Sequence, residues 1–377
     1  MGVLSSTIDV PTARGRLARL RGLTEAAGVS AVLVSPGSDL RYLIGVGGGS
    51  FERLTALVVP ADPAVAPCFV VPKLEYAGLG HIPFDDLEVE VRPWVDGEDA
   101  HALALAGLPP GPMAFSDTTT ALHLFQLRDA GATDQRPAWP IVRELRMRKT
   151  PEELAELRAA GAAIDRVHSR IAEWLRPGRT EREVGSDIAA AIVEEGHAAA
   201  EFVIVGSGPN GSSPHHALSD RVIERGDVVV VDIGGPLPSG YCSDSTRTYA
   251  VGRAPEPDVA SAYAALQASH QAAVDAVRPG VTCQDVDRAA RRVLVEAGLG
   301  DHFIHRTGHG IGLDVHEEPY IVEGNVLPLE SGMTFSIEPC IVFQGRWGAR
   351  IEDIVAVTAD GAERFNNRPR DLVVIPG

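Results

Sequence analysis

Five side chains in the C-terminal half of the chain have the types and the spacing of ligands for two metal ions. They are four carboxylates and one imidazole: Asp232, Asp244, His309, Glu338 and Glu352. Four carboxylates that converge inside a protein repel one another strongly unless cations neutralise them. Two divalent ions would cancel that charge, and a pair of such ions can activate water for hydrolysis. The five residues therefore predict a metallohydrolase.

The two carboxylate pairs share one local pattern, in which an apolar strand, a turn and a second strand follow one another. Asp232 ends the strand VVVVD, and Asp244 lies beyond the turn in YCSDSTRT. Glu338 ends the strand MTFSIE, and Glu352 lies beyond the next turn in ARIEDI. Within each pair, the two residues are about equally far from the turn. An antiparallel hairpin would therefore place the two carboxylates of a pair side by side.

An internal repeat explains why two such pairs occur. Residues 176–184 read RPGRTEREV, and residues 278–286 read RPGVTCQDV. Each copy predicts that one helix ends at Pro-Gly and that the next begins at a threonine cap, with an acidic residue three positions on. The triplets ERG at 224–226 and ESG at 330–332 each lead into a carboxylate-bearing strand with the same spacing. Each half is expected to be two helices followed by a hairpin, with the site at the seam between the halves.

The plain structural alternative for the carboxylates is a network of salt bridges. Arg247 and Arg350 are close enough in sequence to pair with some of them. However, Asp232 and Glu338 each end an apolar strand, where an unpaired carboxylate is costly to bury. Oxygen ligands with a single imidazole suit manganese, iron, cobalt or zinc, whereas structural zinc sites favour cysteine and histidine.

Length and composition indicate two globular domains and exclude several classes of partner. At 377 residues, with 45% hydrophobic content, the chain can form two cores. We expect an α/β domain over residues 1–140 and a second domain over residues 141–377. The net charge of -17 argues against nucleic acid and anionic membranes as partners, and no apolar run reaches membrane-spanning length. Widely spaced cysteines and the lack of a signal-peptide pattern predict a cytoplasmic protein.

Several of these segments together resemble the metallopeptidases with the pita-bread fold, which comprise methionine aminopeptidase, aminopeptidase P and prolidase. The matching stretches are PHHALSD, VVVDIG, YCSDSTRT, TGHGIGLDVHEEP, FSIEP and ARIEDI, which cover most of residues 140–370. In the first domain, SDLRYLIGV is similar to the creatinase/prolidase N-terminal domain. The resemblance implies an α/β N-terminal domain and an α+β catalytic domain with pseudo-twofold pita-bread architecture. RIED and YCSD are closer to the Xaa-Pro branch than to the methionine branch.

The resemblance implies a distinct role for each ligand candidate. Asp244 and Glu352 would bridge the two metals, and Asp232 would chelate one of them. His309 and Glu338 would complete the coordination of the other ion. Glu338 would also carry a proton from the attacking water toward the leaving nitrogen.

The resemblance also implies residues that contact the substrate. His215, in the frame PHxxxSD, and His316 would contact the scissile bond and the leaving group, and would stabilise the tetrahedral intermediate. Arg350 resembles an arginine beside the active site of Xaa-Pro peptidases, and Tyr241 is expected to bind substrate with it. At Tyr320 the chain departs from those prolidases that place an arginine after HE-x-P to hold the proline carboxylate.

The predicted function is therefore a dinuclear-metal-dependent peptidase that cleaves Xaa-Pro bonds in dipeptides or at the N-terminus of short peptides. Its cofactors would be two divalent ions, with manganese preferred over cobalt, zinc or iron. It would act as a homodimer on small peptides with proline at the second position. Two alternatives are a hydrolase or lyase of non-peptide amides on the same fold, and a binding module that lost catalysis. The complete ligand set disfavours the binding module.

Overall fold

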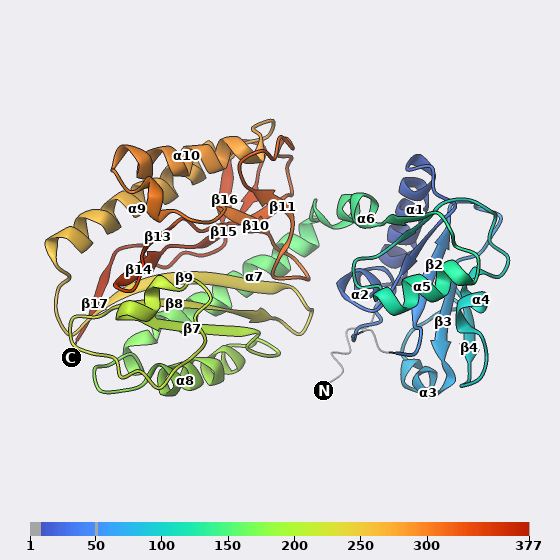
Figure 1. The fold of residues 1–377 in the computed structure, drawn as a ribbon, viewed down its shortest axis with the longest axis horizontal. Coiled ribbons are helices and arrows are strands. Elements are labelled where there is room, and N and C mark those ends of the chain that lie inside the picture. The colour runs from blue at the N-terminus through green and yellow to red at the C-terminus, as the bar shows by residue number, and fades with distance from the viewer. Residues whose placement is uncertain (1–8, 50–51, 377) are drawn as a thin grey trace. The chain divides into compact units, whose positions relative to one another are not determined.

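The computed structural model describes residues 9–49 and 52–376. The first eight residues, on which the signal-peptide expectation partly rests, lie outside this description. The chain divides into two compact units, Met1–Arg146 and Met147–Gly377, whose elements are drawn in Figure 1. Within the described ranges, no helix has both the length and the apolar composition needed to cross a bilayer.

The first unit is built on a mixed sheet flanked by helices. Its strands are β1 (Ala31–Val34), β2 (Ala56–Pro60), β3 (Cys68–Pro72), β4 (Glu90–Trp94), β5 (Met113–Phe115) and β6 (Gln135–Pro137). Its helices are α1 (Val10–Ala26), α2 (Ser38–Ile44), α3 (Lys73–Tyr76), α4 (Ala100–Leu105), α5 (Ala121–Asp129) and α6 (Trp139–Arg146). The strand order is β4-β3-β2-β1-β5-β6. Strands β1 to β3 are buried at every position, as expected for a sheet covered on both faces.

The second unit contains two helix pairs and two main sheets. The helices are α7 (Pro151–Ser169), α8 (Glu181–Glu194), α9 (Pro257–Ala276) and α10 (Cys283–Glu296). The first sheet, ordered β17-β9-β8-β7, contains β7 (Phe202–Ser207), β8 (Val228–Pro236), β9 (Cys242–Val251) and β17 (Val373–Ile375). The second sheet, ordered β11-β10-β12-β15-β16, contains β10 (Gly308–Gly310), β11 (Glu317–Ile321), β12 (Thr334–Ile337), β15 (Asp353–Val357) and β16 (Ala362–Arg364). A separate hairpin pairs β13 (Cys340–Phe343) with β14 (Trp347–Arg350).

The internal repeat is visible in this arrangement. Each half contributes two helices and then strands, and the strands of both halves lie between the two helix pairs (Figure 1). In both copies the glycine before the second helix has a positive φ, 89° at Gly178 and 86° at Gly280, a conformation that glycine adopts without strain. Thr180 forms a capping box at the start of α8. Its counterpart Thr282 instead donates its hydroxyl to Asp285 Oδ2 at 2.6 Å, so only the first copy has the predicted cap.

Each half has its own apolar core. In the first half, α8 packs on β7, and its Val184 and Ile188 belong to an apolar cluster that also contains Val229 and Val231 of β8. In the second half, α10 packs on the other sheet through side chains that include Val286, Leu294, Phe335 and Ile337. Helices of each half therefore pack against the strands of that half, and this close packing restricts the movement of the strands that line the seam between the two sheets.

Candidate two-metal site

The structure brings all five ligand candidates together at the seam of the second unit. Asp232 lies on β8, Asp244 on β9 and His309 on β10. Glu338 directly follows β12, and Glu352 directly precedes β15. Their potential ligand atoms form overlapping groups of three within which all atoms lie within 4.8 Å of one another. Both halves of the repeat thus supply side chains to one cluster.

The first carboxylate pair does not have the predicted side-by-side register. Asp232 lies opposite Thr246, two positions beyond Asp244. The position of the turn causes this shift. Pro236 pairs with Cys242, so the hairpin is centred one residue closer to the C-terminus than the midpoint between Asp232 and Asp244. The two carboxylates are diagonal neighbours, and they still share one face because side chains alternate with a period of two.

The second carboxylate pair lies at a break between two ladders. The registers of β12 with β15 and of β13 with β14 continue one another, which sets Glu338 across from Glu352. Pro339 follows Glu338 and has no N–H to continue the ladder. The backbone N–H of Glu338 instead donates to the Thr307 carbonyl at 2.8 Å, and that of Glu352 donates to the Thr246 carbonyl at 3.1 Å. These bonds tie both glutamates to the neighbouring strands that carry the other ligand candidates.

His309 lies between the carboxylates with its ring oriented by the backbone. Its Nδ1 lies 3.1 Å from the Gly310 carbonyl oxygen, so Nδ1 carries a proton and Nε2 is the nitrogen that faces the carboxylates. Nε2 lies 3.6 Å from Asp244 Oδ2 and 3.1 Å from Glu338 Oε1. The adjacent Gly308 must be glycine, because a Cβ there would lie 1.8 Å from the Ser336 carbonyl oxygen. This close approach explains the GHG sequence.

Burial and mutual repulsion shift the pKa values of the carboxylates. Burial raises the pKa of Asp244 well above its ordinary value, and the charge of Asp232 raises it further. Burial likewise raises the pKa of Glu352 well above its ordinary value, and the charge of Asp244 adds to the effect. Glu338 is different, because the hydrogen bond with His309 outweighs its burial and lowers its pKa. The cluster thus has more negative charge than its own surroundings neutralise.

Among the described residues, the two arginines of the salt-bridge alternative pair with only one of the four carboxylates. Arg350 pairs with Asp232, but Arg247 pairs with Asp353 at 2.8 Å instead of with a ligand candidate. Asp232 Oδ1 and Glu352 Oε1 are buried and have no hydrogen-bond partner among the residues that the structure describes. Buried oxygens with free lone pairs, beside an imidazole nitrogen, fit divalent cations of the manganese-to-zinc series.

Thr246 is a site residue that the sequence reasoning missed. Its hydroxyl donates to Glu352 Oε2 at 2.7 Å and accepts from Arg350 Nε at 3.1 Å. Thr246 follows Asp244 by two positions on β9, so the strand period alone would have placed it on the same face. It orients a glutamate of one half from a strand of the other.

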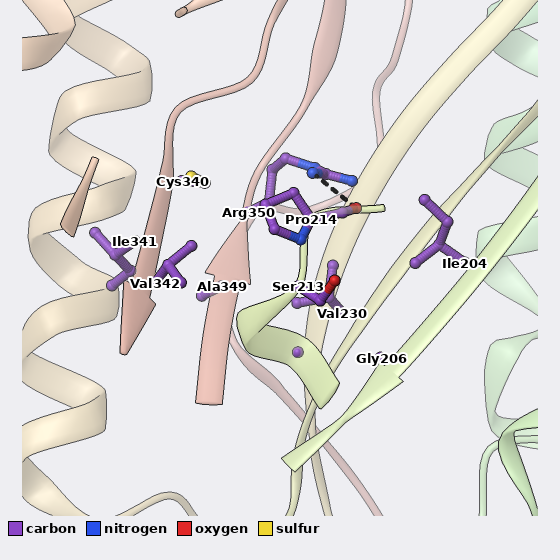
Figure 2. Close-up of a pocket in the computed structure, with 11 residues that line it drawn as sticks. Ile204, Gly206, Ser213, Pro214, Val230, Cys340, Ile341, Val342, Ala349 and Arg350 are labelled. Carbon is purple, nitrogen blue, oxygen red and sulfur yellow. Dashed lines mark hydrogen bonds between the residues drawn. The ribbon is translucent and has the colours of Figure 1, made fainter. Parts of the chain in front are cut away.

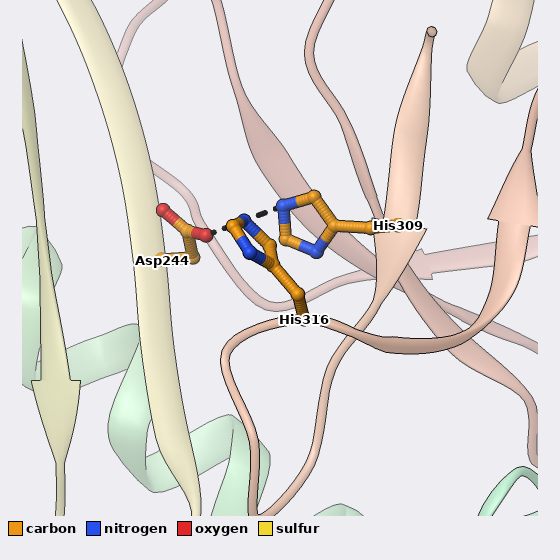
Figure 3. Close-up of side chains that lie close together, drawn as sticks. All are labelled: Asp244, His309 and His316. Atoms are coloured by element: carbon orange, nitrogen blue, oxygen red, sulfur yellow. Dashed lines mark ion pairs between the residues drawn. The ribbon is translucent and has the colours of Figure 1, made fainter. Parts of the chain in front are cut away.

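Of the two predicted substrate histidines, His316 lies at the cluster. The His316 ring meets the His309 ring edge to face, with centroids 4.1 Å apart, and Figure 3 shows it beside Asp244. Burial and the neighbouring His309 lower the pKa of His316 to about 4. His215 is exposed, and its charge is the smallest of the named contributions to the pKa of His316. Arg350 Nη1 reaches the carbonyl of Pro214, next to His215, at 3.5 Å (Figure 2).

Tyr241 and Tyr320 are the two remaining positions that the sequence analysis singled out. Tyr241 packs against the apolar group that includes Cys242 and Ile311, and its substrate role stays a prediction. Tyr320, which replaces the arginine of some prolidases, has the guanidinium of Arg306 above its ring, 4.5 Å from the centroid. Arg306 is half-buried, and none of the ion pairs found among the described residues involves it. The positively charged Arg306 side chain therefore lies beside Tyr320, the position at which the sequence departs from the prolidase pattern.

Comparisons with known proteins agree with this geometry. Residues 155–359 match the metallopeptidase family M24, and residues 16–148 match the creatinase/prolidase N-terminal domain. The chain is 54% identical over 374 residues to a probable dipeptidase PepE from Mycobacterium bovis, with 99% of each chain covered. A crystal structure of dipeptidase PepE from Mycobacterium ulcerans is 56% identical with a TM-score of 0.95, covering 99% of this chain and 100% of that chain. The prolidase from Thermococcus sibiricus is 35% identical with a TM-score of 0.89, covering 98% and 100%.

Proposed function

The chain belongs to metallopeptidase family M24, and on that premise we propose that it cleaves the Xaa-Pro bond of dipeptides. Family membership confirms the resemblance seen in the sequence and the predicted fold class, and it makes the chain a peptidase. The relatives named as dipeptidases and as a prolidase support dipeptides with proline in second position as the substrate class.

The observation that carries the proposal is the convergence of the five ligand candidates around uncompensated acidic charge. Asp232, Asp244 and Glu352 form one group of potential ligand atoms, and His309, Glu338 and Glu352 form another. The two groups share Glu352, as expected for two ions held close together. Divalent ions bound there supply Lewis-acid activation of water and of a peptide carbonyl.

The side chains around the cluster have proposed roles in hydrolysis. Glu338 accepts a proton from the attacking water and delivers it to the leaving nitrogen. As in any peptide bond, this nitrogen must receive a proton to leave as an amine; in an Xaa-Pro bond it belongs to the proline ring and has no hydrogen before cleavage. His316 and His215 donate hydrogen bonds to the tetrahedral intermediate and the substrate. Arg350 fixes Asp232 and the backbone next to His215.

We further propose manganese as the physiological metal, a homodimer as the active form and the cytoplasm as the location. A donor set of four carboxylates and one imidazole, dominated by oxygen, supports manganese. A native mass measurement and metal analysis of the purified protein would test the first two points.

The experiment that tests the function is a peptide panel after chelator treatment and manganese addition. It includes Xaa-Pro dipeptides, Xaa-Pro tripeptides, dipeptides without proline, and small non-peptide amides. The proposal expects metal-dependent cleavage of the Xaa-Pro dipeptides. Cleavage of tripeptides would extend the function to an aminopeptidase. Cleavage confined to proline-free dipeptides or to other amides would refute the Xaa-Pro assignment.

A further inference from the structure

A fully buried carboxylate lies at the first residue of α8, outside the metal cluster. The side chain of Glu181 accepts hydrogen bonds from the Ser207 N–H at 2.8 Å and the Ser207 hydroxyl at 2.6 Å. It also accepts from the Ser219 hydroxyl at 2.6 Å, from His216 Nε2 at 2.7 Å and from Asn210 Nδ2 at 3.1 Å. Burial alone would raise the pKa of Glu181, but the hydrogen bonds from Ser207, Ser219 and His216 hold it below its ordinary value.

All of these donors belong to one segment, residues 207–219, which we call the His215 loop. Glu181 binds both ends of this loop and the residue next to His215. Leu218 packs against the start of the helix, because a Cβ at Gly185 would lie 2.5 Å from it. One carboxylate therefore organises the whole loop from the side of α8.

The opposite side of the loop faces the metal cluster and is also fixed. A Cβ at Gly348 would lie 2.0 Å from the Gly211 carbonyl oxygen, so β14 touches the loop backbone directly. The Gly345 N–H donates to Ser212 Oγ at 3.1 Å. Arg350 reaches the Pro214 carbonyl (Figure 2), and a cavity of only about 10 Å³ is left beneath this part of the loop. The loop is clamped between Glu181 and Arg350.

The internal repeat shows that the helix start itself does not require this carboxylate. The position that corresponds to Glu181 in the second copy is Cys283, which is equally buried and begins α10. A buried carboxylate is costly unless its hydrogen bonds are satisfied, and all the donors that satisfy it come from the loop. The charge therefore stabilises the loop that carries His215.

We infer that Glu181 is a positioning residue, which holds the His215 imidazole against the substrate by fixing the backbone on both sides of it. This inference rests on the proposed role of His215 in peptide hydrolysis. Among the described residues, the hydrogen bonds of the Glu181 side chain go to this loop and to none of the five ligand candidates. A misplacement of about 1 Å in a substrate-contacting group costs on the order of 100-fold in rate, so the effect of losing this clamp is measurable.

The test is a double-mutant cycle between Glu181→Gln and His215→Ala, measured as kcat/KM on the best-cleaved peptide of the panel. Glutamine keeps the size of the side chain, but its NH2 group cannot accept the bonds from the loop. We expect Glu181→Gln to lower kcat/KM roughly 10- to 100-fold, with manganese binding unchanged. In the His215→Ala background the same substitution should lower it less than about threefold. The matched control is Glu183→Gln on the same helix turn, where the exposed glutamate only caps Thr180; it should stay within about twofold.

The cycle separates positioning from a general loss of structure. An undiminished effect of Glu181→Gln in the His215→Ala background would overturn the inference, because a purely structural role does not depend on His215. If Glu181→Gln does not fold, His216→Ala replaces it at a half-buried position, with an expected fall of about 3- to 10-fold that again disappears without His215. If His215→Ala alone leaves kcat/KM within twofold, Glu181 has nothing to position and the inference fails. Failure of the wild-type protein to cleave Xaa-Pro peptides refutes the proposed function separately, since the cycle uses any peptide that is cleaved.

Discussion

Replacing Asp244 by asparagine should stabilise the metal-free protein and abolish the stabilisation that metal confers. Asp244 is buried, and its carboxylate atoms lie within 4.8 Å of those of Asp232 and Glu352. Two unit charges at that distance repel by roughly 3.5 kcal/mol at an effective dielectric constant of about 20. The raised pKa values of Asp244 and Glu352 show that protonation already relieves part of this repulsion. A net gain of about 1–3 kcal/mol therefore remains for the asparagine variant.

The assay is thermal unfolding of both proteins, with chelator and with manganese. A gain of 1–3 kcal/mol corresponds to a rise in Tm of roughly 3–9 °C in chelator for a unit of this size. Metal at about 100 times its Kd stabilises the wild-type protein by about 2.7 kcal/mol for each site, and the variant should lose this gain at the sites that use Asp244. The order of the two Tm values should therefore reverse between the two conditions.

The matched control is the same substitution at Asp353, a fully buried aspartate whose charge is compensated. Arg247 Nη2 lies 2.8 Å from its Oδ1, and despite burial the charges of Arg247 and His270 lower its pKa. Asp353→Asn breaks a buried ion pair and should destabilise the protein by roughly 3–5 kcal/mol in both conditions. Equal destabilisation by both substitutions in chelator would refute the claim that the Asp244 cluster carries uncompensated charge.

Three further predictions concern other parts of the second unit. Thr246→Val removes the hydroxyl that orients Glu352 and should weaken manganese binding about 10- to 100-fold; an unchanged metal titration would contradict this. His168 is buried and neutral, because burial and the Arg247 charge lower its pKa to about 3. In the unfolded chain, His168 binds a proton below about pH 6.5, whereas in the folded protein it stays neutral at that pH. The free energy of unfolding should therefore fall as pH falls from 6.5 toward 5. His168→Gln should remove up to about 1.4 kcal/mol per pH unit of that slope in urea unfolding, and equal slopes would refute it. Arg306→Ala should raise KM for Xaa-Pro dipeptides about 10-fold, but not for the corresponding C-terminal amides, if the cation beside Tyr320 binds the substrate carboxylate; equal effects on both would exclude that role.

Much of the site could be predicted because its information is local. Strands that end in a carboxylate, turns and period-two spacing predicted which side chains share a face. The repeat of RPG-x-T predicted the paired architecture, because the same helix ends recur in both halves at Gly178 and Gly280.

The rest depends on tertiary contacts that spacing does not encode. The one-residue shift of the first turn changed the register of Asp232 and Asp244. The choice of Arg350 over Arg247 as the partner of Asp232 depends on how β14 meets β8. Glu181 lies 26 or more residues from every group that donates to it, so its role is visible only in the folded chain.

The most direct test of the central claim is the activity of chelator-treated protein on an Xaa-Pro dipeptide as manganese is added back. The account predicts no hydrolysis without metal, and activity that rises to a plateau at two equivalents of metal for each chain. Full activity in the metal-free protein, or two bound equivalents without Xaa-Pro cleavage, would contradict it.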